Sequence, residues 1–257
     1  MSQEPLHYSV FAADIQNYSG RHALVQIDLR HLLHALLLEA SAAAGVDRPN
    51  WCLQDQGDGE LSLVPGTMPK PRLVADFIRE LGIGLARHNL RCGPEERLRL
   101  RVAMHCGEAH VDGTGFAGDA PVVAARLLNS EPAREALNAV PEADLALILS
   151  TPMFEAVNGY RDIKQGDFRR VRVREKTFKA TAWVSVPGFA PPALADHTDD
   201  APRTERPAGG RSGGGEARPA AEQPAAGPGS FRHAVFHGPV SFGDGPVAGR
   251  DVNYGDK

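Results

Sequence analysis

The composition of the chain changes sharply near residue 187, and this change limits how much of the sequence can fold. Between residues 191 and 230, more than half of the positions are Pro, Gly or Ala, and almost none carries a large apolar side chain. Such a segment cannot bury enough surface to offset the conformational entropy it would lose on folding. We therefore predict a folded domain over residues 1–187 and a disordered linker over residues 188–230.

Apolar residues return in the C-terminal segment 231–257, which we call the tail. It repeats Gly-Pro-Val, and its Phe-Gly-Asp at 242 is echoed by Tyr-Gly-Asp at 254. Short apolar pieces separated by glycines can stack as strands of a cross-β unit. The tail resembles bacterial amyloid-signalling tails, which implies recruitment of a protein partner with a matching motif. A disordered end without a partner is the alternative.

Charge, hydropathy and cysteine content set limits on function. The formal net charge of −4 gives no general attraction to nucleic acid or to an anionic membrane, so neither is expected as a partner. No apolar run is long enough to span a bilayer, and the N-terminal residues lack the features of a signal peptide. The three cysteines follow no pattern and are expected to be reduced thiols. We therefore expect a cytoplasmic protein.

The first 187 residues alternate between strand-like and helix-like segments. Apolar residues recur at helical spacing in two long segments, and short apolar runs between turn residues indicate strands. A mixture of hairpins and crossovers argues against a wholly parallel sheet and indicates the α+β class. The expected strands lie at 8–14, 61–65, 145–150, 168–173 and 181–186, with a hairpin over 98–112 that reverses at Cys106 and Gly107. The expected helices lie at 29–44, 73–89 and 120–128, the last capped by Asp119 and carrying Pro121 in its first turn.

Two carboxylates stand out against this background. Asp14 ends an apolar strand, and Asp58 occupies a Gly-Asp-Gly turn just before another apolar strand. Taken alone, Asp14 is an ordinary strand-end acid and Asp58 an ordinary turn residue. Together they could supply two hard oxygen ligands for Mg²⁺ or Mn²⁺, with the carbonyl of Ile15 as a third. Such a site suits a divalent ion bound to a nucleoside triphosphate.

Several ordered motifs together resemble a class III nucleotidyl cyclase, over about residues 7–186. The resemblance implies a ferredoxin-like core: a mixed, largely antiparallel sheet with helices on one face. It also implies a head-to-tail homodimer with active sites shared between the subunits. A weaker resemblance points to a divergent branch common in actinobacteria. The motifs are "VFAADIQNYSGR", "GDGELSLV", "LRLRVAMHCGEAH" with "GFAGDAPVVAARLL", and "RVREKTFKATAW".

The resemblance assigns roles residue by residue. Asp14 and Asp58 would hold the metal ions, which activate the ribose 3′ hydroxyl for attack on the α-phosphate. Arg126, from the other subunit, would stabilise the charge that develops on that phosphate. Lys176 is the first candidate for the triphosphate-binding lysine of the family, and Lys179 is the second.

Three positions depart from the family pattern. Val122 stands four residues before Arg126, where the family has an asparagine that orients the ribose, and valine can form no hydrogen bond through its side chain. The two base-reading positions carry Gln54 and Gly115, instead of the Lys and Asp of adenylate cyclases or the Glu and Cys of guanylate cyclases. The base is therefore undetermined, and a pyrimidine nucleotide stays open as an alternative to a purine.

Two classes of function follow from this pattern. In the first, the protein is a phosphorus–oxygen lyase that converts a nucleoside triphosphate to a cyclic monophosphate and pyrophosphate, in signalling or defence. In the second, it is a catalytically degenerate cyclase-homology domain that senses nucleotides or assembles through the tail. Retention of both Asp14 and Asp58 favours catalysis, because two carboxylates brought together must be compensated.

If the tail is an assembly motif, a synthetic peptide of residues 231–257 should form fibres that bind an amyloid dye. The expected reason is that its apolar segments pair as strands between copies of the peptide. A peptide that stays soluble and unstructured under the same conditions contradicts this interpretation and favours the disordered end.

Overall fold

The structure, a computed structural model, describes residues 4–112, 115–175 and 177–194, and its centre is an eight-stranded mixed sheet. The strand order is β2-β3-β1-β4-β6-β8-β7, with β5 paired to the far end of β4. Only the β4–β6 pair is parallel. The strands are β1 (Leu6–Ile15), β2 (Cys52–Asp55), β3 (Gly59–Pro65), β4 (Leu100–Asp112), β5 (Gly115–Ala117), β6 (Leu145–Ser150), β7 (Arg169–Glu175) and β8 (Phe178–Ser185).

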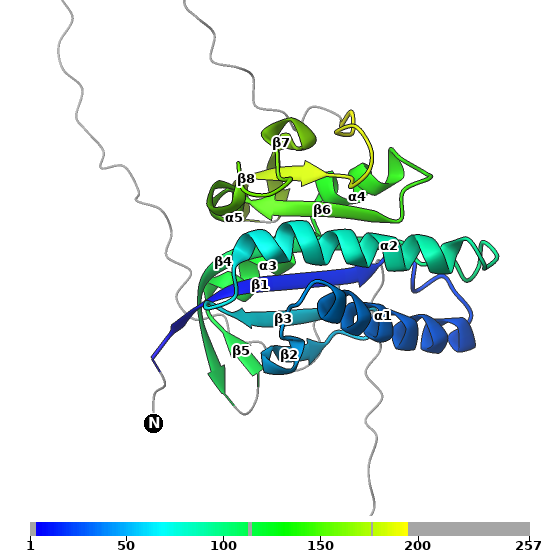
Figure 1. Ribbon diagram of the computed structural model, residues 1–257, viewed down its shortest axis with the longest axis horizontal. Helices are drawn as coiled ribbons and strands as arrows, with labels where there is room; N and C mark the ends of the chain where they lie inside the picture. Colours follow the sequence, from blue (N-terminus) through cyan, green and yellow to red (C-terminus); the bar gives the residue numbers. More distant parts are fainter. Residues whose placement is uncertain (1–3, 113–114, 176, 195–257) are drawn as a thin grey trace, which may run out of the picture.

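Helices cover both faces of the sheet. α1 and α2 lie over one face, in front in Figure 1, and α5 contributes to the same apolar core. α3 and α4 cover the opposite face and form a second core with the other side of the strands. An irregular π-helical turn over Arg72–Phe77 leads into α2. The helices are α1 (Ala23–Ala43), α2 (Ile78–Asn89), α3 (Asp119–Leu128), α4 (Glu131–Asn138) and α5 (Thr151–Val157).

The first half of this arrangement is the expected ferredoxin-like core. The elements β1-α1-β2-β3-α2-β4 form four neighbouring strands in the order β2-β3-β1-β4, with both helices on one face. Each strand of this unit is antiparallel to its neighbours. The α+β class and the mixed, largely antiparallel sheet are therefore confirmed.

The expected covering of one face by helices holds for α1 and α2 of this core, and the whole domain also carries helices on the opposite face. In β1, Phe11 and Ala13 enter the core beneath α1 and α2, while Val10 and Ala12 enter the core beneath α3 and α4. All six residues of β6 are buried. Strands that are apolar on both sides need a layer on each face, and α3 and α4 supply the second layer.

Two local predictions are wrong. β4 runs without a break from Leu100 to Asp112, so the chain does not reverse at Cys106 and Gly107; it pairs back on itself only at β5. Gly118, at φ +120°, is the N-cap of α3, and Asp119 is the first residue inside the helix. The continuous strand arises because its partners β1 and β6 lie along most of its length and satisfy its backbone groups.

Three aromatic side chains fill the centre of the core beneath α1 and α2. Phe11, Trp51 and Phe77 form a mutual cluster with ring centroids 5.5 to 6.0 Å apart and tilted or edge-on planes. Such arrangements add to the stability gained from burial alone. The cluster joins β1, the segment before β2 and the start of α2, and so fixes the hairpin β2–β3 against the helices.

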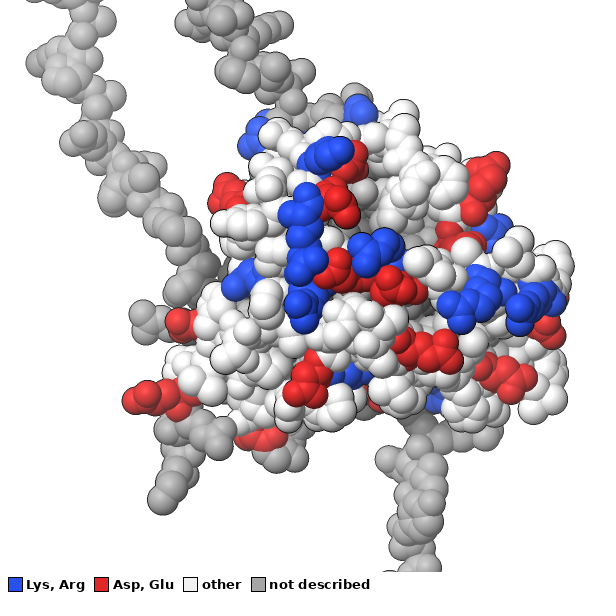
Figure 2. All heavy atoms as spheres, in the orientation of Figure 1, with Lys and Arg blue, Asp and Glu red and all other residues white. Residues whose placement is uncertain are grey.

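The surface shows no large region of one charge sign on the face seen in Figure 2, where acidic and basic side chains of the described residues are interspersed. Among those residues, no helix has both the length and the apolar character needed to cross a membrane. The tail and almost all of the linker lie outside the described residues, so the domain boundaries stay a prediction.

Replacing Phe77 by alanine should lower the free energy of unfolding by about 3–5 kcal/mol, because the side chain is fully buried and its loss leaves a cavity. Urea unfolding followed by circular dichroism measures the change. Leu90→Ala, at a position that is 86% exposed, is the matched control and should stay within about 0.5 kcal/mol of wild type. A Phe77→Ala protein as stable as the control would contradict the packing described above.

Candidate active site

Asp14 lies at the buried end of β1, on the face covered by α3 and α4. Its carboxylate has no solvent exposure and pairs with Arg101, which lies directly opposite on β4. Arg101 Nε donates to Oδ1 over 2.9 Å and Arg101 Nη2 donates to Oδ2 over 2.5 Å. A bidentate pair of this kind is the strongest form of carboxylate–guanidinium contact. Arg101 of the same chain therefore compensates the buried charge of Asp14.

Asp58 is brought to the same strand end by the β2–β3 hairpin. The amide of Ile15 donates to the Asp58 carbonyl over 2.9 Å, and Gly59 pairs with Asp14 across the sheet. A Cβ at Gly59 would lie 2.0 Å from the carbonyl oxygen of Ala13, so this position accepts only glycine without displacing the strands. The Gly-Asp-Gly turn thus holds Asp58 beside Asp14 through close backbone contact.

The electrostatics of Asp14 reflect both neighbours. Burial raises the pKa of Asp14 to about 7, the Arg101 guanidinium opposes this rise, and the negative charge of Asp58 adds to it. The raised pKa means that ionisation of Asp14 is unfavourable in this environment without further positive charge. A divalent cation would supply that charge.

The donor set fits a hard cation in kind. Two carboxylates and the Ile15 carbonyl are oxygen ligands of the type that Mg²⁺ and Mn²⁺ prefer. Among the described residues, no group of three or more His, Cys, Asp and Glu side chains is placed to hold a metal ion. An ion at Asp14 and Asp58 would therefore complete its coordination with backbone, water or substrate oxygens, and would share Asp14 with Arg101.

Arg126 and Val122 lie one turn apart on α3, and both are partly buried. Within the described residues, the Arg126 side chain forms no hydrogen bond or ion pair. A guanidinium left without an anionic partner in one chain is available to an anion from outside it. Val122 places an apolar surface beside it.

The remaining predicted site residues are spread over the sheet. Gln54 lies on β2, and its Oε1 is buried and accepts no hydrogen bond within the described residues. Gly115 begins β5, and its amide donates to Asp112 Oδ1 over 3.0 Å. Lys179 is exposed on β8, which is separated from β1 by β4 and β6, while Lys176 lies outside the described residues.

One chain thus brings together Asp14, Ile15 and Asp58, and it leaves Lys179 three strands away. Any site that also uses Lys179 would need a second copy of the chain or a large rearrangement. This distribution is compatible with the shared-site homodimer that the sequence resemblance implies.

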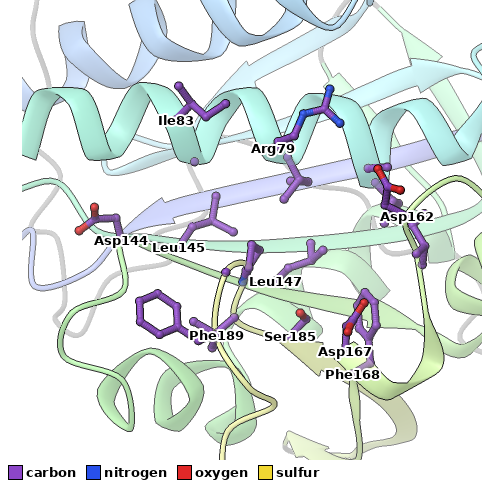
Figure 3. Close-up of a pocket in the computed structure, with 18 of the residues that line it drawn as sticks. Arg79, Ile83, Asp144, Leu145, Leu147, Asp162, Asp167, Phe168, Ser185 and Phe189 are labelled. Atoms are coloured by element: carbon purple, nitrogen blue, oxygen red, sulfur yellow. The ribbon is translucent and has the colours of Figure 1, made fainter.

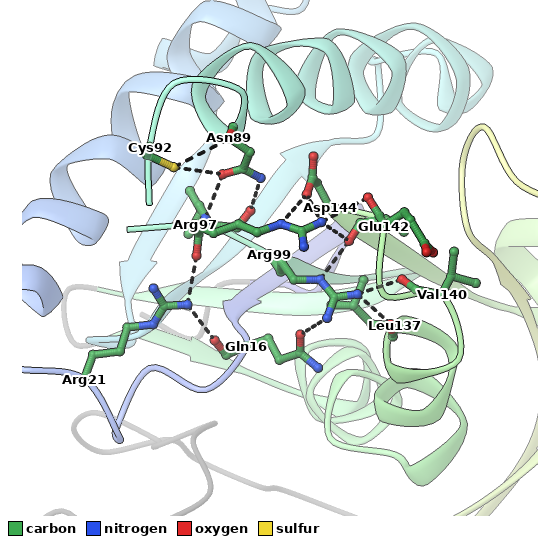
Figure 4. Close-up of polar contacts among 12 residues, drawn as sticks. Gln16, Arg21, Asn89, Cys92, Arg97, Arg99, Leu137, Val140, Glu142 and Asp144 are labelled. Atoms are coloured by element: carbon green, nitrogen blue, oxygen red, sulfur yellow. Dashed lines mark hydrogen bonds and ion pairs between the residues drawn. The ribbon is translucent and has the colours of Figure 1, made fainter. Parts of the chain in front are cut away.

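Arg101 and the polar network beside it were not predicted from the sequence. Arg99 Nη1 donates to Gln16 Oε1 over 2.9 Å, and the same guanidinium donates to the carbonyls of Leu137 and Val140 at the end of α4 (Figure 4). Gln16 Nε2 in turn donates to Asn138 Oδ1 over 2.6 Å. These contacts tie the end of β1 to α4, next to the Asp14–Arg101 pair. The signal that could have indicated this network is the spacing of Arg97, Arg99 and Arg101 at every second position, leading into a strand that is otherwise rich in apolar residues.

Comparisons with known proteins agree with this fold. No protein-family model matches the sequence, and no curated protein matches it. The chain is similar to the crystal structure of the guanylyl cyclase Cya2, with a TM-score of 0.51 and 14% identity over 75% of this chain and 100% of that one. It is also similar to an adenylate/guanylate cyclase/hydrolase from Silicibacter pomeroyi, with a TM-score of 0.50 and 20% identity over 73% of this chain and 100% of that one. At these identities the similarity establishes a class III cyclase fold and nothing finer; the actinobacterial branch stays a prediction.

Replacing Asp14 by alanine should destabilise the protein by about 3–5 kcal/mol, because it leaves the Arg101 charge buried without its partner. Asp14→Asn keeps one acceptor oxygen for Arg101 and should lower the free energy of unfolding by a smaller amount than Asp14→Ala. Urea unfolding of both variants measures the difference.

The double variant Asp14→Leu with Arg101→Met is the matched control. It removes both charges and keeps apolar volume, so its stability should return close to that of wild type. If Asp14→Ala alone were as stable as wild type, the ion pair would not be formed in solution.

Proposed function

We propose that the protein is a divalent-metal-dependent nucleotide cyclase, which converts a nucleoside triphosphate to a cyclic monophosphate and pyrophosphate and acts in cytoplasmic signalling or defence. The observation that supports it is the convergence of Asp14 and Asp58 at one buried strand end, within a cyclase fold. A domain retained only for packing has no need of a second carboxylate beside an already buried one.

In this proposal Asp14 and Asp58, with the Ile15 carbonyl, hold Mg²⁺ or Mn²⁺ together with the triphosphate. The metal, when bound, supplies positive charge that favours ionisation of the ribose 3′ hydroxyl and neutralises the leaving pyrophosphate. The 3′ oxygen forms a bond to the α-phosphorus, the bond from that phosphorus to the bridging oxygen breaks, and the hydroxyl proton is lost to solvent. No oxidant or further co-reactant is needed for this balance.

The other assigned residues come from a second copy of the chain in a head-to-tail homodimer. Arg126 forms no ion pair with any described residue, and it would stabilise the negative charge that develops on the α-phosphate. Lys176, or Lys179 as the second choice, would bind the triphosphate. Gln54 Oε1 is a buried acceptor without a donor, which a nucleobase N–H would satisfy, whereas Gly115 offers no side chain to the base.

A second function is favoured by a specific observation. Arg101 occupies both carboxylate oxygens of Asp14, and Val122 cannot orient the ribose. If Arg101 stays in place, the domain would bind a nucleotide without turning it over. It would then act as a nucleotide-sensing or assembly module, with the tail as the part that reaches a protein partner.

Purified full-length protein incubated separately with ATP, GTP, CTP and UTP in the presence of Mn²⁺ should convert one of them to a cyclic monophosphate and pyrophosphate, detected by chromatography. Asp58→Asn should reduce this to background, and it leaves the Asp14–Arg101 pair intact. Arg126→Ala should reduce turnover by about 10³ or more. If all four nucleotides survive prolonged incubation, the catalytic proposal fails. Retained nucleotide binding without turnover would then support the sensor.

Complementation tests whether the sites are shared. Mixed in equal amounts and allowed to exchange subunits, Asp58→Asn and Arg126→Ala chains should regain about one quarter of wild-type activity, since about half of the dimers are mixed and each mixed dimer has one intact site. No recovery, with subunit exchange demonstrated independently, would place Asp58 and Arg126 in the same subunit's site or outside any site.

A further inference from the structure

An open groove lies on the side of the sheet opposite Asp14, between α2 and the strands β6 and β8 (Figure 3). Its volume is about 750 Å³, and no residue of the candidate active site lines it. This is large enough for several bulky side chains. The floor and walls are mainly apolar, and include Ile78, Ile83, Leu145, Leu147, Phe168 and Phe189.

The rim of the groove is acidic. Four of the five charged residues that line it are Glu142, Asp144, Asp162 and Asp167, and the fifth is Arg79. Asp144 is paired with Arg97 at 2.8 Å, and Arg79 is paired with Asp76 and Glu80, each at 3.3 Å. Within the described residues, Glu142, Asp162 and Asp167 form no ion pair. Three carboxylates thus remain to attract a cationic ligand.

The chain passes along the wall of this groove after β8. Pro187, Gly188 and Phe189 line the groove, and the described residues end at Leu194, which packs into the core beneath α3 and α4. If the 36 residues from 195 to 230 behave as the predicted flexible linker, their end-to-end distance would be roughly 30–36 Å. A linker of that length would let the start of the tail reach the groove, at an effective concentration of about 1 mM.

The start of the tail also has the matching chemistry. Residues 231–237 read Phe-Arg-His-Ala-Val-Phe-His, with two phenylalanines and a valine beside one arginine and two histidines. No Asp or Glu occurs between Glu222 and Asp244, so the segment carries only positive or neutral side chains. We propose that this groove binds residues 231–237 of its own chain, with the aromatic side chains in the apolar floor and Arg232 near the acidic rim.

Other occupants fit less well. The free carboxylates at the rim repel the phosphates of a nucleotide. A second copy of the folded domain offers no general complement to an acidic rim, because residues 1–187 carry 21 Lys and Arg against 23 Asp and Glu. The proposal does not depend on the proposed cyclase function. Its consequence is that the domain shields the first part of the tail and so limits pairing of that segment with other copies.

A photo-crosslinker in the full-length protein tests this directly. p-Benzoylphenylalanine at Ile83, which is 47% exposed in the groove, should form a crosslink to residues 231–237, identified by mass spectrometry. The same group at Leu90, which follows the last residue of α2 and lies outside the groove lining, should form no crosslink to the tail. Mixing isotope-labelled with unlabelled protein shows whether both ends of the crosslink belong to one chain.

A charge variant supplies the second readout. Asp162→Lys with Asp167→Lys should reduce the yield of the tail crosslink by about fivefold, because two attractive contacts become repulsive. Glu155→Lys, exposed on α5 and outside the groove lining, should leave the yield unchanged. Absence of a tail crosslink, a crosslink mainly between different chains, or a yield insensitive to the rim charges would each overturn the proposal. None of these results depends on nucleotide turnover.

Discussion

The buried ion pair between Asp14 and Arg101 is the constraint on which the geometry of the sheet's functional end depends. An ionised carboxylate removed from water is several kcal/mol unfavourable unless a charge partner with good geometry compensates it. Arg101 can do so only if β1 and β4 keep their register, since a shift of one residue would turn its side chain to the other face. The pair therefore specifies how the two central strands align, and with them the attachment of the β2–β3 hairpin at Ile15.

The same pair governs what the site can do. A divalent cation at this site would compete with Arg101 for the oxygens of Asp14, and the negative charge of the neighbouring Asp58 would favour the cation. Arg101 is thus either a counter-charge that yields when metal and triphosphate arrive, or a lasting replacement for the metal. The enzyme and the sensor differ in this one respect more than in any other feature of the chain.

The fold and the proximity of Asp14 and Asp58 could be predicted from the sequence because both follow from local patterns. An apolar strand ending on Asp14 and a glycine turn carrying Asp58 are readable at the level of single elements, and antiparallel pairing brings them together. Arg101 was missed because its role depends on which residue lies opposite it, and register is not readable from one strand. The second helical layer was missed for a related reason: β6 shows apolar residues at every position, a pattern that periodicity alone does not assign to one covered face or two.

The groove and the carboxylates lie on opposite faces of the sheet, and this separation bears on regulation. Neither Asp14 nor Asp58 lines the groove, so the proposed docking of the tail there would not exclude a nucleotide. A connection between the groove and the candidate active site would have to run through β4 and the segment before it. There, Arg97 contacts Asp144 at the groove rim and Arg101 contacts Asp14. Because β4 is hydrogen-bonded to neighbours on both sides, a shift at one end would have to move a central strand. The two proposals, tail docking and nucleotide chemistry, are therefore independent: either one can hold without the other.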